Sequence, residues 1–81
     1  MSTSAYFSLE PLLLLCAGRA GVAVAELRID DIAALCSVDA RTVSRWKAEQ
    51  RLPTMTADRV ACALGLHPSA IWGRAWFEGE T

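Results

Sequence analysis

The stretch from Ala33 to Trp46, AALCSVDARTVSRW, constrains the fold more than any other part of the sequence. Asp39 is a good N-cap for a helix, because its carboxylate can accept hydrogen bonds from the first free backbone N–H groups. Val43 and Trp46 follow at helical spacing and are expected to face inward. The stretch therefore predicts the end of one helix, a tight turn and the start of a second helix.

The two predicted helices differ in the side chains that define them. Upstream of the turn, Ile32, Leu35 and Cys36 form an apolar stripe at three-and-four spacing, and small alanines between them allow another helix to approach closely. The second helix, from about Ala40 to Glu49, carries polar and basic side chains on its outer face: Arg41, Ser44, Arg45 and Lys47. Two short helices of this kind suit the major groove of DNA. The sequence predicts a helix-turn-helix.

This stretch resembles the helix-turn-helix of small phage repressors, Cro-like proteins and their bacterial relatives. The family pattern has Ala, then Gly four residues on, an apolar or small residue, a Ser/Thr/Asp cap, and T-V-S-R-W or similar. Here Ser37 stands where Gly is usual. The residue at this turn is expected in the left-handed conformation, in which a Cβ costs roughly 1 kcal/mol. The departure removes the strongest single marker of the motif.

A second match follows the recognition helix. In phage-repressor-like domains this segment has the form L-P-x-x-x-A-x-x-V/I-A-x-A-L-G-L/V-x-P-x-x-I/L-W/F, and residues 52–72 read LPTMTADRVACALGLHPSAIW. The resemblance covers residues 29–72, a little over half the chain. It implies a lambda-repressor-like fold and a phage- or prophage-encoded regulator that occupies an operator, as a homodimer on a palindrome.

An N-terminal helix is expected before the central pair. Ser8 and Pro11 mark its start, and a run of four leucines carries it to about Ala17, before Gly18. The run is apolar all round, which indicates burial on more than one side or a contribution to an oligomer. Residues 19–26 read as a loop, because Gly21 and the preceding Gly18 argue for a break.

A helix capped by Thr56 and a short helix from Pro68 to about Trp72 are expected after the pair. No residue alternation typical of a strand is visible, so the predicted fold class is all-α. The chain is expected to form one compact five-helix domain with a central helix-turn-helix. Its core is expected over about residues 8–77, with loose tails at 1–7 and 78–81.

Composition limits the possibilities further. The 81 residues suffice for one small domain, and 53% of them are apolar, an excess that indicates a partner surface or a dimer interface. Trp72 and Trp76 either extend the core or form an exposed aromatic patch. No apolar run is long enough for a membrane span, and the N-terminus lacks the basic start of a secretory signal. We expect a protein of the bacterial cytoplasm, associated with the nucleoid when bound.

The sequence carries little that catalysis or metal binding needs. Its three cysteines are widely spaced, and with a single histidine they give no zinc-ligand spacing. Buried, reduced thiols are expected at Cys16, Cys36 and Cys62. His67 beside Pro68 is expected to be a cap or loop residue, and no nucleophile or Gly-rich phosphate loop accompanies it in sequence. No enzymatic activity, metal, cofactor or small-molecule ligand is expected.

Charge is distributed unevenly, although the net charge is only −1. Residues 40–59 hold five basic side chains against two acidic ones, whereas residues 1–39 hold two against five. This pattern indicates a basic patch on a mildly acidic body, or a merely solvated helix face. The helix-turn-helix pattern beside it favours the patch, which gives oriented affinity for DNA.

The resemblance implies base contacts from the outer face of the recognition helix, at Ala40, Arg41, Ser44 and Arg45. A guanidinium can bind guanine O6 and N7 with two hydrogen bonds, and a methyl side chain can touch thymine. DNA phosphates are expected to be held by Arg28, Thr42, Lys47 and Arg51. The predicted function is that of a sequence-specific, double-stranded DNA-binding transcriptional regulator.

Two alternatives stay open. An excisionase-like recombination directionality factor shares the pattern T-V-x-R-W followed by L-P. Excisionases usually continue with a β-wing, where this chain has a helix cap, so strand content would favour them. The other alternative is a protein-interaction module that kept the fold and lost DNA affinity, and the near-neutral net charge and apolar excess motivate it.

Overall fold

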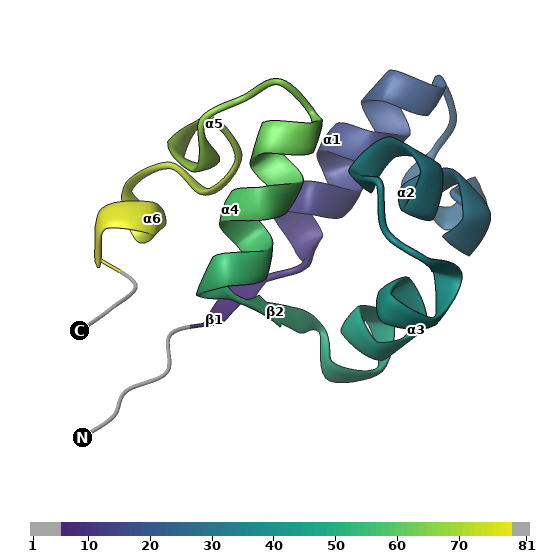
Figure 1. Cartoon of the computed structure of the whole chain (residues 1–81). Coiled ribbons are helices and arrows are strands. Elements are labelled where there is room, and N and C mark those ends of the chain that lie inside the picture. Colours follow the sequence, from purple (N-terminus) through teal and green to yellow (C-terminus); the bar gives the residue numbers. More distant parts are fainter. Residues whose placement is uncertain (1–5, 79–81) are drawn as a thin grey trace.

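The computed structural model describes residues 6–78, which are mostly helical (Figure 1). This part of the chain forms six α-helices: α1 (Glu10–Ala20), α2 (Ile29–Cys36), α3 (Ala40–Glu49), α4 (Thr54–Ala63), α5 (Pro68–Trp72) and α6 (Arg74–Glu78). A 3₁₀ turn, η1 (Val24–Glu26), precedes α2, and two strands, β1 (Tyr6–Ser8) and β2 (Arg51–Pro53), pair antiparallel. The expectation of a mostly helical protein is confirmed. The predicted number of helices and the absence of strands are wrong, because residues 6–78 form six helices in place of five and a small sheet.

The helix α1 begins as expected and ends later. The Ser8 hydroxyl accepts a hydrogen bond from the N–H of Glu10 at 3.3 Å, at the predicted start. The helix then runs through Gly18 to Ala20 and ends at a glycine in the left-handed conformation. A helical Gly costs about 1 kcal/mol relative to Ala, and the buried leucine and cysteine side chains of α1 offset that cost. The loop expected over residues 19–26 is therefore shorter, and it contains η1.

The start of α4 also differs from expectation. It begins at Thr54, so Thr56 lies in its first turn instead of capping it. Pro53 occupies the N-cap with an extended backbone, φ −68° and ψ 158°. α5 has the predicted bounds, and His67 caps it as expected by accepting the N–H of Ser69 at 3.1 Å. Caps of this kind are set by neighbours in sequence, which is why most of them could be predicted.

The small sheet joins the segment before α1 to the segment after α3. Its register pairs Tyr6 with Pro53, Phe7 with Leu52 and Ser8 with Arg51. Phe7 and Leu52 face the core and are 4% and 0% exposed. Residues 6 and 7 therefore belong to the packed domain, although a loose tail over 1–7 was expected. The remainder of that tail, and residues 79–81 of the other, lie outside the described residues.

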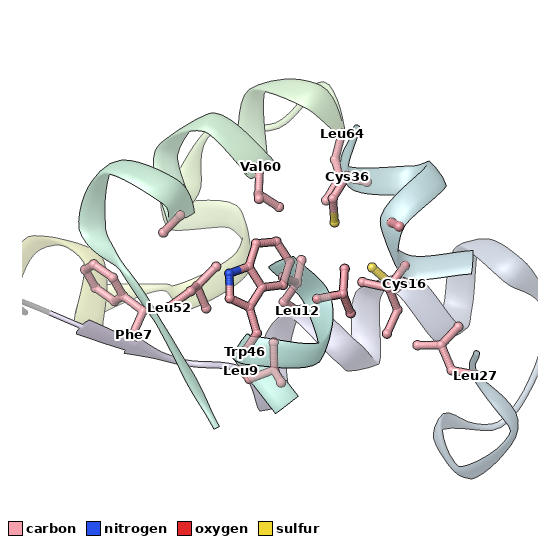
Figure 2. Close-up of a cluster of buried hydrophobic side chains, with 14 of the residues drawn as sticks. Phe7, Leu9, Leu12, Cys16, Leu27, Cys36, Trp46, Leu52, Val60 and Leu64 are labelled. Atoms are coloured by element: carbon pink, nitrogen blue, oxygen red, sulfur yellow. The ribbon is translucent and has the colours of Figure 1, made fainter. Parts of the chain in front are cut away.

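The core contains side chains from both strands and from α1 to α5. Figure 2 shows those of the strands and of α1 to α4. Trp46 of α3 lies among them and is 3% exposed, as expected from its spacing to Val43. The larger side chains that are fully buried include Leu9, Leu12, Ile32, Leu52, Val43 and Val60. No polar or charged side chain is buried in the part of the chain that the structure describes. Three of the leucines in the run after Pro11 are at least partly buried, so the run serves mainly the core.

The three cysteines have two different environments. Cys16 and Cys36 are buried in the core, where a hydrogen bond to Cys16, together with burial, raises the pKa of Cys36 (Figure 2). Cys62 is exposed, so the expectation of three buried thiols is wrong for this residue. The reason is helical geometry, because α4 turns Val60 and Ala61 inward and leaves the next position outside.

Aromatic rings attach α5 and α6 to β1. The Phe7 ring centroid lies 5.5 Å from that of Trp72 and 5.2 Å from that of Trp76. The indole N–H of Trp72 donates to the carbonyl of Ser8 at 2.8 Å. Both tryptophans therefore extend the core, whereas Phe77 is 71% exposed. None of the helices between residues 6 and 78 combines the length and apolar character that a membrane crossing needs.

Candidate nucleic-acid interface

The turn between α2 and α3 is built from local hydrogen bonds. Ser37 adopts the predicted left-handed conformation, with φ 60° and ψ 43°, and the N–H of Val38 donates to the carbonyl of Ala33 at 3.1 Å. Asp39 caps α3 as predicted, since its Oδ1 accepts the N–H of Thr42 at 3.0 Å and the Thr42 hydroxyl at 2.5 Å. These two hydrogen bonds lower the pKa of Asp39. The first turn of α3 is thereby fixed.

The helix α3 divides into a buried face and a solvent face. Val43 and Trp46 are 0% and 3% exposed and anchor the helix to the core. Because a helix turns about 100° per residue, residues at i, i+3, i+4 and i+7 share the opposite side. That side consists of four exposed residues: Arg41, Ser44, Arg45 and Ala48. Ala48 is not among the predicted contacts, although its seven-residue spacing from Arg41 would have revealed it.

The other candidate residues of α3 lie at the edges of the solvent face. Ala40 and Lys47 are exposed on the side nearer to Val43. Thr42 is half-buried on the opposite side, and both its N–H and its hydroxyl are bonded to Asp39. These bonds make Thr42 a support of the turn, in addition to the phosphate contact expected of it from the sequence.

The cations of α3 are available to an external anion. Over residues 6–78, the side chains of Arg45 and Lys47 form no hydrogen bond and no ion pair. Among the described residues, Arg41 has only a coulombic attraction to Asp39, whose carboxylate is already bonded to Thr42. An exposed cation without a fixed partner keeps its donors free for charge-assisted hydrogen bonds.

Two candidate residues lie outside α3. Arg51 follows the helix on β2, and its guanidinium carbon lies 4.0 Å from the centroid of the Tyr6 ring. Arg28 is the exposed N-cap of α2, and its backbone N–H donates to the carboxylate of Asp31 at 3.3 Å. The length of α2 separates Arg28 from the turn by about 12 Å. The structure thus places seven of the eight predicted residues on α3 and its continuation, and Arg28 apart.

Within residues 6–78, His67 serves as a helix cap and no cluster of metal ligands is present. Among the residues described, no group of three or more His, Cys, Asp and Glu side chains could hold a metal ion. The Nδ1 of His67 lies 2.9 Å from the Ser69 hydroxyl and accepts the Ser69 N–H, so this nitrogen caps α5.

Comparison with known proteins adds no further constraint. No family model, no curated protein and no solved structure matches this chain. The candidate interface is therefore defined by its own geometry: the capped turn, the two buried anchors of α3, and the basic and small side chains on its solvent face.

Proposed function

We propose that the protein is a sequence-specific, double-stranded DNA-binding transcriptional regulator, in which α2 and α3 act as a helix-turn-helix on a lambda-repressor-like fold. The observation that carries this proposal is the division of α3. Its two large apolar side chains are buried, while Arg41, Ser44 and Arg45 are exposed and aligned on the opposite side. The Asp39 cap fixes the first turn of this helix. A helix with two such faces suits the major groove of DNA.

The chemistry of the solvent face fits base recognition. Arg41 and Arg45 lie one turn apart, and each guanidinium can donate two hydrogen bonds to guanine O6 and N7. Ser44 can donate to or accept from a base edge, and Ala40 can touch a thymine methyl group. The ten residues of α3 span about 15 Å, against a groove about 12 Å wide. Lys47, Arg51 and Arg28 then hold phosphates at both ends of the interface.

The regulator is proposed to act by occupying an operator and blocking polymerase. Two copies on a palindrome would place their recognition helices about 34 Å apart, one turn of DNA. The deciding experiment is selection of bound sequences from a random duplex pool at moderate salt. A palindromic consensus supports a dimeric regulator, and an asymmetric consensus supports binding by single copies. Absence of any enriched sequence contradicts the proposal and leaves the protein-interaction module.

One observation favours the excisionase alternative. The strand β2 begins directly after α3 and contains the L-P pair. However, its partner β1 precedes α1, whereas a β-wing would follow the L-P pair, and α4 begins immediately after Pro53. We therefore keep the transcriptional regulator as the main proposal. Tandem, directly repeated sites in the selected pool would favour the excisionase over the transcriptional regulator.

A further inference from the structure

The outward face of the β1–β2 sheet carries an arginine held on an aromatic ring. Side chains alternate along a strand, so the inward Phe7 and Leu52 leave Tyr6 and Arg51 on the other face. In the register, Arg51 lies opposite Ser8, which makes Tyr6 its diagonal neighbour on the same face. The guanidinium carbon of Arg51 lies 4.0 Å from the centroid of the Tyr6 ring.

This contact fixes the guanidinium without using its hydrogen-bond donors. The ring attracts the cation through its negatively polarised face, while the five N–H donors lie in the guanidinium plane. Elsewhere in residues 6–78, the Arg51 side chain has no hydrogen bond or ion pair. A long, flexible cation thus lies over the ring, exposed and with its donors unbonded within residues 6–78, as a site for a phosphate oxygen requires.

The position of Arg51 relative to α3 is fixed by the end of that helix. Gln50 adopts the left-handed conformation, φ 59°, and its Nε2 donates to the carbonyl of Lys47 at 2.8 Å. The Gln50 carbonyl in turn accepts the N–H of Leu9 at 3.2 Å, which ties this point to the start of α1. In Figure 1, β2 leaves the end of α3 and runs back toward β1 along the edge of the molecule.

We propose that Tyr6 and Arg51 form a clamp for a DNA phosphate beside the groove that α3 occupies, with Tyr6 as the residue that positions the Arg51 guanidinium. This inference rests on the proposed function. Charge complementarity supports a phosphodiester as the ligand, because neither strand contains an acidic residue and, on the last turn of α3, Lys47 offsets the charge of Glu49. The clamp adds affinity for DNA of any sequence and fixes the register of α3.

The test uses the full chain and a duplex obtained by selection, with affinity measured by fluorescence anisotropy at several salt concentrations. We expect Arg51→Ala to weaken binding about fivefold to tenfold and to reduce the salt slope by about 0.9 for each bound copy. Tyr6→Ala and Tyr6→Leu are expected to cause a smaller loss, and Tyr6→Phe is expected to bind like the wild type because the ring face remains. The Tyr6→Ala and Arg51→Ala double variant should bind no more weakly than Arg51→Ala alone.

The variants separate the possible failures. Phe77→Ala, which removes an exposed ring on α6, serves as the matched control and should leave binding unchanged. Thermal unfolding identifies any variant that fails to fold, and Tyr6→Leu, which keeps an apolar side chain, replaces Tyr6→Ala in that case. Wild-type affinity and slope in Arg51→Ala overturn the clamp, and wild-type binding in both Tyr6→Ala and Tyr6→Leu overturns the role of Tyr6. A wild-type chain that binds no duplex overturns the proposed function itself.

Discussion

Ser37 holds the turn before α3 in a conformation that costs an L-residue roughly 1 kcal/mol. Its hydroxyl forms no hydrogen bond within residues 6–78 that would repay this cost. Ser37→Gly is therefore expected to raise the free energy of unfolding by about 0.5 kcal/mol or slightly more, since the greater freedom of Gly in the unfolded chain offsets part of the gain. Thermal unfolding should show a rise in Tm of a few degrees, about 2–5 °C.

Gln50 provides the matched control for this change. It has nearly the same backbone conformation, φ 59°, but its side chain donates a hydrogen bond to the carbonyl of Lys47. Gln50→Gly relieves similar strain and loses that bond, so its gain in Tm should be smaller or absent. If Ser37→Gly unfolds at the same temperature as the wild type, the turn is not strained.

Asp39 makes the stability of α3 depend on pH in the acid range. Hydrogen bonds from Thr42 lower its pKa in the folded protein, so the carboxylate contributes stability above the ordinary Asp value of 3.8. That contribution is lost as the pH falls through the lowered folded value. We expect Asp39→Asn, which keeps a capping oxygen without the charge, to lose less Tm than the wild type between about pH 4 and pH 2. Parallel Tm curves for the two proteins over this range would contradict the assignment.

The hydrogen bond of Asp39 to Thr42 was predicted from the sequence because it joins residues three apart. The bond of Gln50 to Lys47 is equally local but was not predicted. Cap and turn residues act on their immediate neighbours, so Asp39, Ser37 and His67 have the roles expected of them. The contact of Tyr6 with Arg51 could not be predicted, because it depends on the pairing of two strands that are distant in sequence.

Among the elements, α3 gives the clearest separation of DNA-contacting roles. Arg45 lies on the side opposite Val43 and Trp46, whereas Lys47 lies at the edge of the solvent face. We expect Arg45→Ala to cost ~1–3 kcal/mol at the selected site and much less at unrelated duplexes, as measured by anisotropy. Lys47→Ala should weaken binding to all duplexes alike and reduce the salt slope. If Arg45→Ala lowers the affinity for all duplexes equally, Arg45 contacts phosphates instead of bases.

β1 is short, but the burial of its side chain Phe7 predicts that the stability of the domain depends on this strand. Phe7 is 4% exposed between β2 and the two tryptophans, so Phe7→Ala should cost about 3–5 kcal/mol of unfolding free energy. Phe77→Ala removes the same atoms from a residue that is 71% exposed and should change stability by less than about 0.5 kcal/mol. Urea unfolding compares the two variants. Similar midpoints for both would show that β1 is not part of the cooperative unit.

The accuracy of the predicted elements follows how local their signals are. The bounds of α2 and α3 agree with expectation, because each helix has an apolar stripe along its length and a cap or turn residue at its ends. α1 and α4 differ by two or three residues at one end, where packing extends a helix past Gly18 or Pro53 starts it early. The sheet was missed because three residues give too little alternation, and α6 because it is only five residues long.

For the whole molecule, the uneven charge determines how binding responds to salt. The net charge of −1 gives the body no general attraction to DNA, so phosphate affinity depends on a few placed cations. Three of the proposed phosphate contacts are cations: Arg28, Lys47 and Arg51. Each neutralised phosphate contributes about −0.9 to the slope of log K against log salt. One bound copy therefore predicts a slope of about −2.7, and two copies predict about −5.4.

Comparing a selected palindrome with its isolated half-site then measures the assembly on DNA. Between about 50 and 200 mM salt, affinity for the palindrome should fall about 1,800-fold, and affinity for the half-site only about fortyfold. Sedimentation of the same complexes should find two copies on the palindrome and one on the half-site. Equal slopes with one copy on each duplex would contradict the homodimer while leaving sequence-specific binding intact. A half-site that already binds two copies would indicate that the proteins associate before they reach DNA, through an interface outside α3.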